Sequence, residues 1–399
     1  MRYYVVKGVV SVQEQIKAIS SYLDNKVGEL EFLLSTLVNI DSGSYDHGGI
    51  ARVMQTLTVN LKEIGYQVDI KKTSETPNLV AKKSGTGEKK ILLIGHADTV
   101  FERGTALSRP YKVEDDKILG PGVADMKAGL VTMVYALKAL ESINFTNYRE
   151  IAIIVGGDEE IGSTSSRHIY ESEAADADAC FVFEPARADG SLVSARKGVG
   201  VFRLTLLGVP AHAGEAPEKG ASAVKELAHK ILALEKLNEL YEGVTLTVGI
   251  IDGGTRANII PEKATAEIDV RLPDLQTARE VIDKIQEIGN KTIDDRVQVI
   301  LEGGINRPPM AKTAGTENLL KIVRNMGSIL DMEIKDITTG GASDGNFIAT
   351  LVPVLDGMGP TGGNYHRADE FIYRKSLLQK TKLAALTLFK LGTQMPSND

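Results

Sequence analysis

Residues 90–98 read KILLIGHAD, a short apolar run that ends in a His-x-Asp triplet. An apolar run of this length is typical of a strand that is buried inside a sheet. In a parallel sheet, ligands gather beyond the carboxyl ends of the strands, which is where His96 and Asp98 fall. Taken alone, the triplet is equally consistent with a capped loop, so its meaning depends on the rest of the chain.

On both sides of this strand, helical and extended patterns alternate along the chain. Further strands are expected at residues 66–70, 78–83, 149–160 and 178–185, the third of them running into a polar turn. Helices are expected at residues 11–38, 49–64, 125–140 and 163–171. This alternation predicts an α/β domain in which a mixed sheet is sandwiched by helices.

The pattern changes near Ala195, where longer strands with alternating apolar residues begin. These strands are expected at residues 197–208, 244–254 and 263–273, with helices at 223–237 and 277–289 between them. Two prolines in residues 305–313 then precede a new helix near Thr316 and mark the return to the first domain. We therefore expect an inserted α+β domain at residues 197–308, and a first domain made of residues 1–196 and 309–399.

Length and composition exclude several classes of protein. A chain of 399 residues with 43% hydrophobic content is long enough for two buried cores. The net charge of -7 argues against a nucleic-acid partner, and no apolar run approaches the roughly 20 residues of a membrane span. Because the N-terminus lacks the apolar region of a signal peptide and the chain has one cysteine, Cys180, we expect cytoplasmic residence.

Histidines and carboxylates recur after the other expected strands and loops. They are Asp125 in GPGVADMKAG, Glu159 and Glu160 in GGDEEIGS, Glu184 in VFEP and His366 in GGNYHRADE. An isolated acidic triplet is more often solvated surface, but the glycines that flank this one favour a sharp turn that aims its carboxylates inward. Imidazole and carboxylate ligands suit zinc, and two cations would offset a carboxylate cluster that otherwise repels itself. Such a pair of metals is suited to amide hydrolysis.

The order of these motifs resembles that of the aminoacylase and glutamate carboxypeptidase family of dinuclear zinc metallopeptidases. The resemblance is carried by HADTV, GPGVADMKAG, GGDEEIGS, VFEP, GVPAHAG, RANIIP, DVRLP and GGNYHRADE, and it covers nearly the whole chain. It implies a zinc exopeptidase-like catalytic domain and an inserted ferredoxin-like domain that serves as a lid and in dimerisation. A homodimer is therefore expected.

The resemblance also implies a role for each candidate residue of the metal site. His96, Asp125 and Glu184 would bind one zinc, and Asp125, Glu160 and His366 would bind the other, with two ions in each chain. Cobalt and manganese share such ligands and are alternatives to zinc. Glu159 would be the general base for a metal-bridging water, and Asp98 would orient the ring of His96.

Substrate contacts are expected mainly from the inserted domain. The resemblance implies that His212 and Asn258 act on the oxyanion side and that Arg271 holds the substrate's terminal carboxylate as a two-point fork. Gly341 and Ser343 in the GGASDGNF loop are expected to line the pocket. The alternatives are a surface role for His212 and a structural salt bridge for Arg271.

These observations predict a metallopeptidase that hydrolyses a small peptide or N-acyl amino acid and releases a C-terminal residue, with glutamate favoured. A di- or tripeptidase or an N-acyl-amino-acid deacylase is the alternative within the same chemistry. A catalytically inactive binding homologue is a third hypothesis, which the presence of Glu159 and all five ligand candidates disfavours.

Overall fold

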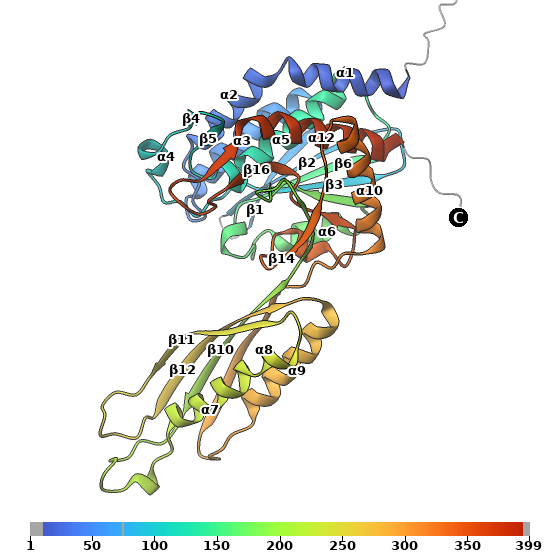
Figure 1. Cartoon of the computed structure of the whole chain (residues 1–399). Coiled ribbons are helices and arrows are strands. Elements are labelled where there is room, and N and C mark those ends of the chain that lie inside the picture. The colour runs from blue at the N-terminus through green and yellow to red at the C-terminus, as the bar shows by residue number, and fades with distance from the viewer. Residues whose placement is uncertain (1–10, 74–75, 394–399) are drawn as a thin grey trace, which may run out of the picture. The chain divides into compact units, whose positions relative to one another are not determined.

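The computed structural model describes residues 11–73 and 76–393 (Figure 1). Contacts divide the chain into two compact units: the first holds Met1–Ser194, Lys312–Ile337 and Ser343–Asp399, and the second holds Ala195–Ala311 and Thr338–Ala342. The expected insert at residues 197–308 lies within the second unit. Residues 338–342, which the sequence pattern assigned to the first domain, cluster with the second unit.

The first unit is built on a six-stranded mixed sheet. Its order is β1 (Gln67–Thr73), β2 (Thr76–Ser84), β6 (Glu150–Gly156), β3 (Lys90–His96), β7 (Ala179–Val182) and β15 (Val354–Leu355). The strands β6, β3, β7 and β15 run parallel, whereas β2 is antiparallel to both of its neighbours. The mixed sheet expected from the alternating pattern is therefore present.

Helices cover both faces of this sheet, which explains why β3 is buried along its whole length and why its residues 91–95 are all apolar. Ile91 and Leu93 face the main core, together with buried residues of α1 (Val12–Asp24), α5 (Ala128–Glu141) and α12 (Arg374–Thr393). Leu92 and Ile94 are equally buried but lie outside that core, on the face where α6 (Arg167–Ala174) packs against β6. In Figure 1, α5 and α12 lie on one side of the sheet and α6 on the other.

The remaining elements of the first unit surround this sandwich. The helices are α2 (Val27–Val38), α3 (His47–Glu63), α4 (Thr105–Ser108), η1 (Val123–Lys127), η2 (Glu159–Ile161), α10 (Ala314–Ile329) and α11 (Gly345–Ile348). A smaller sheet runs β4 (Lys112–Glu114), β5 (Lys117–Leu119), β17 (Phe371–Tyr373), β16 (Gly359–Gly363) and β8 (Pro185–Ala186). The strands β9 (Leu192–Arg196) and β14 (Asp336–Thr339) form a separate pair.

The second unit has a β-α-β-β-α-β order with one antiparallel sheet. The sheet order is β11 (Thr245–Gly253), β12 (Lys263–Leu272), β10 (Gly198–Leu207) and β13 (Gln298–Arg307). The helices are η3 (Pro217–Lys219), α7 (Ala223–Glu235), α8 (Leu237–Leu240) and α9 (Leu275–Asn290). Figure 1 shows α7 and α9 along one face of the sheet, where they close a core of their own. This connectivity is ferredoxin-like.

Three expected helices have different limits in the structure, and one of them, expected over residues 163–171, is α6 (Arg167–Ala174). The helix expected over residues 11–38 is interrupted at Asn25 and Lys26, between α1 and α2. The helix expected from Asp125 begins at Ala128 instead, because Asp125 and Met126 have non-helical backbone angles. Side chains outside the local segment hold Asp125 in this conformation, as described below.

Among the described residues, no helix combines the length and the apolarity that crossing a bilayer requires. The expectation that the N-terminus lacks a signal peptide concerns residues 1–10 in part, and these lie outside the described residues.

Candidate metal centre

The ends of three parallel strands bring the expected site residues to one edge of the sheet. His96 is the last residue of β3, Glu159 and Glu160 follow β6, and Glu184 follows β7. Because β3 pairs in parallel with both β6 and β7, these ends lie next to one another. Four of the seven predicted metal-site residues are therefore positioned by the sheet itself.

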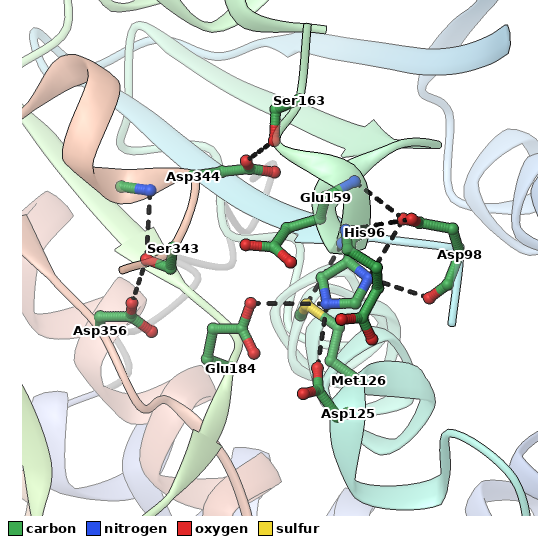
Figure 2. A network of polar contacts seen from close by, with 12 residues as sticks. His96, Asp98, Asp125, Met126, Glu159, Ser163, Glu184, Ser343, Asp344 and Asp356 are labelled. Carbon is green, nitrogen blue, oxygen red and sulfur yellow. Dashed lines mark hydrogen bonds and ion pairs between the residues drawn. The ribbon is translucent and has the colours of Figure 1, made fainter. Parts of the chain in front are cut away.

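Asp125 lies between two histidines and faces each with a different oxygen. Its Oδ1 is 3.0 Å from His96 Nε2, and its Oδ2 is 3.3 Å from His366 Nε2. Glu184 Oε1 approaches His96 Nε2 at 3.5 Å, and Glu160 Oε2 approaches His366 Nε2 at 3.2 Å. All five predicted ligands thus converge, with Asp125 in the central position, and Figure 2 shows Asp125 and Glu184 beside His96.

Asp98 supports the site through the backbone as well as through His96. Its Oδ1 accepts a hydrogen bond from the backbone N–H of Glu159 and its Oδ2 accepts one from Glu160, both at 3.1 Å. His96 Nδ1 lies 3.0 Å from the Asp98 carbonyl oxygen and 3.4 Å from its carboxylate. Ser44 donates to the same carboxylate at 2.8 Å. Asp98 therefore fixes the acidic turn and the histidine ring together (Figure 2).

Glu370 supports Asp125 and was missed by the sequence analysis. Its carboxylate accepts hydrogen bonds from the backbone N–H groups of Gly122, Ala124 and Asp125, at 2.8 to 3.2 Å. These contacts explain why the chain is not yet helical at Asp125, and the Asp125–Met126 peptide bond is cis. The only signal in the sequence was the acidic residue four positions after His366.

The three residues of the acidic triplet, Asp158, Glu159 and Glu160, have different surroundings. Asp158 is buried and accepts hydrogen bonds from the Ser165 backbone N–H and the Ser166 hydroxyl, so it shapes the turn. Glu160 faces His366. Glu159 lies near Glu184 instead: the pKa of Glu184 is raised by burial, by the negative charge of Asp125 and, to a smaller extent, by the negative charge of Glu159. In Figure 2 the Glu159 carboxylate lies on the Glu184 side of His96. The two adjacent glutamates therefore point to different parts of the site.

Burial and crowding shift the titration of the acidic groups. Burial raises the pKa of Glu160 to about 7 and that of Glu184 to about 8, and the negative charge of Asp125 adds to both shifts. Burial also acts to raise the pKa of Asp125, but hydrogen bonds from the two histidines hold it below its usual range. The carboxylates thus titrate as one coupled cluster.

The pKa values of both histidines are also raised, which in their case favours the charged form. Hydrogen bonds with Asp125 and Glu160 raise the pKa of His366 to about 10. Burial is the largest influence on His96 and lowers its pKa, yet the surrounding carboxylates, Glu184 first, raise it well above its usual value on balance. The site therefore retains positive charge to offset its carboxylates, a role that a divalent cation can take over.

The donor set fits such a cation. One nitrogen or oxygen from each of His96, Asp125 and Glu160 lies within 4.8 Å of the others. Glu160 Oε1 is buried and has no hydrogen-bond partner among the residues that the structure describes. A buried carboxylate oxygen is rarely left without a partner, and a metal ion would supply one. Imidazole and carboxylate donors suit zinc, cobalt or manganese.

The predicted substrate residues of the second unit are described within that unit. His212 and Asn258 are exposed and lie on paired loops, in which Ala213 N donates to the Asn258 carbonyl at 3.0 Å. Arg271 is engaged on its own strand, since its Nε and Nη2 donate to the two carboxylate oxygens of Asp269 at 2.7 and 3.0 Å. Gly341 accepts from Arg196 Nη1 at 2.9 Å through its carbonyl oxygen.

Ser343 belongs to the first unit and has a structural environment. It is 1% exposed, and its hydroxyl donates to Asp356 at 2.6 Å (Figure 2). Its role in substrate binding stays a prediction, and the same holds for His212, Asn258, Arg271 and Gly341.

Comparison with known proteins defines the class to which this site belongs. The model of the peptidase family M20/M25/M40 matches residues 92–390, so the chain belongs to this family. It is therefore an enzyme, a metal-dependent hydrolase of peptide or amide bonds.

Particular relatives agree with this assignment. Carboxypeptidase G2 from Pseudomonas sp. (strain RS-16) is 32% identical over 372 residues, covering 90% of this chain and 88% of that protein. Succinyl-diaminopimelate desuccinylase from Dechloromonas aromatica (strain RCB) is 28% identical over 344 residues, covering 81% and 88%. The crystal structure of aminopeptidase PepT from Bacillus cereus matches with a TM-score of 0.77 at 23% identity, covering 92% of this chain and 97% of that one. At 23% identity, the similarity to the PepT structure shows a shared fold.

Proposed function

We propose that the chain binds two zinc ions and hydrolyses the amide bond before a C-terminal amino acid, with glutamate as the favoured leaving residue. His96, Asp125 and Glu184 would hold one ion, and Asp125, Glu160 and His366 the other. The central observation is that Asp125 faces both histidines with different oxygens, as a carboxylate shared between two cations would. Cobalt and manganese are the alternative metals.

The chain's own residues divide the catalytic work. When bound, the cations supply Lewis-acid polarisation of the scissile carbonyl and a water of lowered pKa. Glu159 would accept the proton of the attacking water and deliver it to the leaving amine. Asp98 would keep the Glu159 turn and the His96 ring in fixed positions during these transfers, because its carboxylate contacts both. His212 and Asn258 would donate to the developing oxyanion.

Recognition of the leaving residue is assigned to Arg271, whose guanidinium can hold a carboxylate at two points. In the structure the guanidinium already holds the Asp269 carboxylate at two points, so a substrate carboxylate would have to displace Asp269. The same pair is also what a structural salt bridge would look like, so comparison of acid and amide substrates is needed. Similarity to carboxypeptidase G2 supports release of a C-terminal residue. The order of the sequence motifs supports glutamate.

A deacylase is the second candidate, supported by the similarity to succinyl-diaminopimelate desuccinylases. A di- or tripeptidase remains within the same chemistry. An inactive homologue is disfavoured because the five predicted ligands converge, together with an unsatisfied buried oxygen of Glu160. We also propose a homodimer and cytoplasmic residence; the presence of a single cysteine, Cys180, which allows no intrachain disulfide, supports the latter.

Two measurements test the proposed function. Metal analysis of protein prepared without chelator should give close to two divalent ions per chain. Release of free amino acid should then be measured from a folyl-glutamate, a tripeptide and an acetylated amino acid. Preferential cleavage of the folyl-glutamate supports the carboxypeptidase, whereas cleavage of the tripeptide or of the acetylated amino acid alone supports the alternatives. Protein that binds metal but cleaves none of the three would contradict the proposal.

A further inference from the structure

A cavity of about 470 Å³ lies in the first unit beside the start of α12. Its walls come from the loop at residues 188–190, from residues 331–334 after α10, and from the first turns of α12. The volume is within the range of small-molecule sites. None of the described residues of the candidate metal centre lines this cavity, so the proposed hydrolysis does not use it.

The side chain of Lys380 lies at the floor of this cavity. Lys380 is 2% exposed, and Ile334 and Ser376, which line the cavity with it, are also buried. Asp331 and Glu333 line the same cavity but are exposed, so they mark its mouth. The cavity therefore connects a buried amine with the solvent.

The surroundings of Lys380 favour the neutral form of its amine. Within the described part of the chain, its one hydrogen-bond acceptor is the Gly190 carbonyl oxygen, 3.2 Å from Nζ. An ammonium group has three N–H donors to satisfy and loses its hydration on burial. Burial accordingly lowers the pKa of Lys380 to about 7, and the negative charge of Asp189 opposes this only in part. Near neutral pH, much of Lys380 is therefore a free amine with a lone pair that can attack an electrophile.

The charges at the mouth of the cavity decide which electrophiles can enter. The exposed residues of the lining include four carboxylates, those of Asp116, Asp189, Asp331 and Glu333. As far as the structure describes this lining, Lys375 is its one exposed cation. An anion would be repelled by the excess of carboxylates, whereas an uncharged compound would not. A positive charge that forms at the floor would be stabilised.

A second cavity, of about 570 Å³, adjoins the first along α12. Met332 and Gln379 line both cavities, and apolar side chains of Val27, Leu330 and Leu378 line the second. Met332 is unbranched and flexible, so it can adjust to a neighbouring group. An aliphatic chain attached at the floor of the first cavity could therefore extend into apolar surroundings in the second.

From this geometry we propose that Lys380 is a covalent binding site for an uncharged aliphatic aldehyde, which enters the cavity and condenses with the amine to an imine. The lysine nitrogen attacks the carbonyl carbon, and the oxygen then leaves as water with the two amine protons, so that a C=N bond remains. Addition of water reverses the reaction, and neither an oxidant nor a reductant is needed. Protonation of the imine gives a cation, which the negative charge of Asp189 would stabilise. This site is separate from the proposed hydrolysis and does not depend on it.

Reductive trapping at pH 7 tests the site. Hexanal and cyanoborohydride are added to the whole protein, and alkylated lysines are located by mass spectrometry of its peptides. The label on Lys380 should exceed that on Lys375 by about tenfold or more, although both line the cavity, because burial leaves much of Lys380 uncharged at this pH. Lys380→Met should remove this label and leave that on Lys375 unchanged. Equal labelling of the two lysines in wild type, or no label on Lys380, would overturn the site.

The class of aldehyde is tested by the ratio of the label on Lys380 to that on Lys72, an exposed lysine of β1 that does not line the cavity. This ratio corrects for the intrinsic reactivity of each aldehyde. It should be about tenfold higher for butanal than for the anionic 4-oxobutanoate, and about threefold or more higher for hexanal than for butanal. Leu378→Asn should remove the difference between hexanal and butanal and keep the label on Lys380. An equal ratio for butanal and 4-oxobutanoate would reject an uncharged ligand, and a ratio that does not rise with chain length would reject an aliphatic one.

Discussion

Glu159 and Glu160 are adjacent in the chain, yet the structure gives them different surroundings, and this predicts different consequences of the same substitution. Glu160→Gln should lower metal content, because it weakens a carboxylate that faces His366. Glu159→Gln should keep the metal and lower kcat by at least about a hundredfold, because it removes only the proton acceptor. Metal analysis and steady-state kinetics on both variants check this.

Each variant serves as the control for the other, since both replace one carboxylate by an amide in the same turn. Retention of most activity in Glu159→Gln would reject its role as general base. Equal metal loss in both variants would mean that the two side chains share one role.

Arg271 is a second residue whose role two substrates can decide. Arg271→Ala should lower kcat/KM on a substrate with a free C-terminal carboxylate by about a hundredfold, and much less on the corresponding amide. The expected reason is the loss of a two-point contact with the carboxylate. Kinetics on the matched acid and amide measure it.

Asp269→Asn is the matched control, because it breaks the present ion pair and keeps the guanidinium. If Arg271 is structural, Arg271→Ala and Asp269→Asn will lower activity on acid and amide alike. The carboxypeptidase assignment would then give way to a broader amidohydrolase.

Among the elements, the turn at the start of η2 is held by the side chain of Asp98, which follows the end of β3. Asp98→Asn should weaken both metal binding and kcat/KM by roughly ten- to a hundredfold, because the amide cannot accept from both backbone N–H groups and the His96 ring as the carboxylate does. Ser44→Ala removes one donor to Asp98 and should have a smaller effect. Competition with a chelator and kinetics compare the two. An effect of Ser44→Ala as large as that of Asp98→Asn would contradict this order.

The helix α12 carries a buried lysine that makes stability depend on pH. Lys380 is 2% exposed, and burial lowers its pKa to about 7, partly opposed by the negative charge of Asp189. The ordinary pKa of 10.5 applies to the unfolded chain, which therefore binds more protons between about pH 7 and 10.5. This lysine makes the free energy of unfolding rise with pH across that window, and its destabilising effect is complete below about pH 7.

Lys380→Met should accordingly raise the free energy of unfolding most below pH 7, by up to on the order of 4 kcal/mol, and the gain should shrink toward pH 10. Denaturant titrations of both proteins from pH 6.5 to 9.5 measure the difference. A gain that stays constant with pH would show that packing, and not the charge of Lys380, is responsible.

The elements differ in how far sequence alone could predict them. The strand at β3 and the residues that follow β6 and β7 were predictable, because a strand buried on both faces leaves a continuous apolar run, and parallel strands end at one edge. The kink at Asp125 was not, because it depends on Glu370, 245 positions away. No local pattern encodes such a partner. The limits of α5 were missed for the same reason.

The candidate site likewise contains some residues that the sequence could predict and others that it could not. The five predicted ligands could be found because each is a metal-binding residue type in a turn or at a strand end. Ser44 donates a hydrogen bond to the Asp98 carboxylate, and Glu370 accepts hydrogen bonds from backbone N–H groups. A single sequence carries no signal for such pairings. Ser343 is expected to line the substrate pocket; its hydroxyl is buried against Asp356 in the structure, and its role in substrate binding stays a prediction.

At the scale of the whole molecule, the chain combines a unit that carries the candidate metal centre with an inserted unit that has its own core. We expect the insert to act as a lid with hinges near Ala195 and near residues 307–309, and this stays a prediction. The insert's sheet is open, with β11 and β13 as its edges. Open edges expose backbone donors and acceptors that can pair with another chain.

The two edges differ in a way that predicts which one associates. On β11, Ile250 and Ile251 are exposed next to each other, whereas the residues at the same level of β13 are Glu302, which is exposed and charged, and Leu301, which is partly buried. We expect two copies to pair through β11 about a twofold axis, because the same apolar edge then meets itself. Ile251→Lys should convert the dimer to monomer, because it would place two like charges in the contact. Ile300→Lys on β13 is the matched control and should leave the dimer intact.

Sedimentation velocity of wild type and the two variants at equal concentration measures this. Thermal unfolding of each variant verifies that the second unit remains folded. A wild-type monomer would reject the dimer outright. Dissociation by Ile300→Lys alone would assign the interface to β13, and in that case the exposed isoleucines of β11 would need a different partner to cover them.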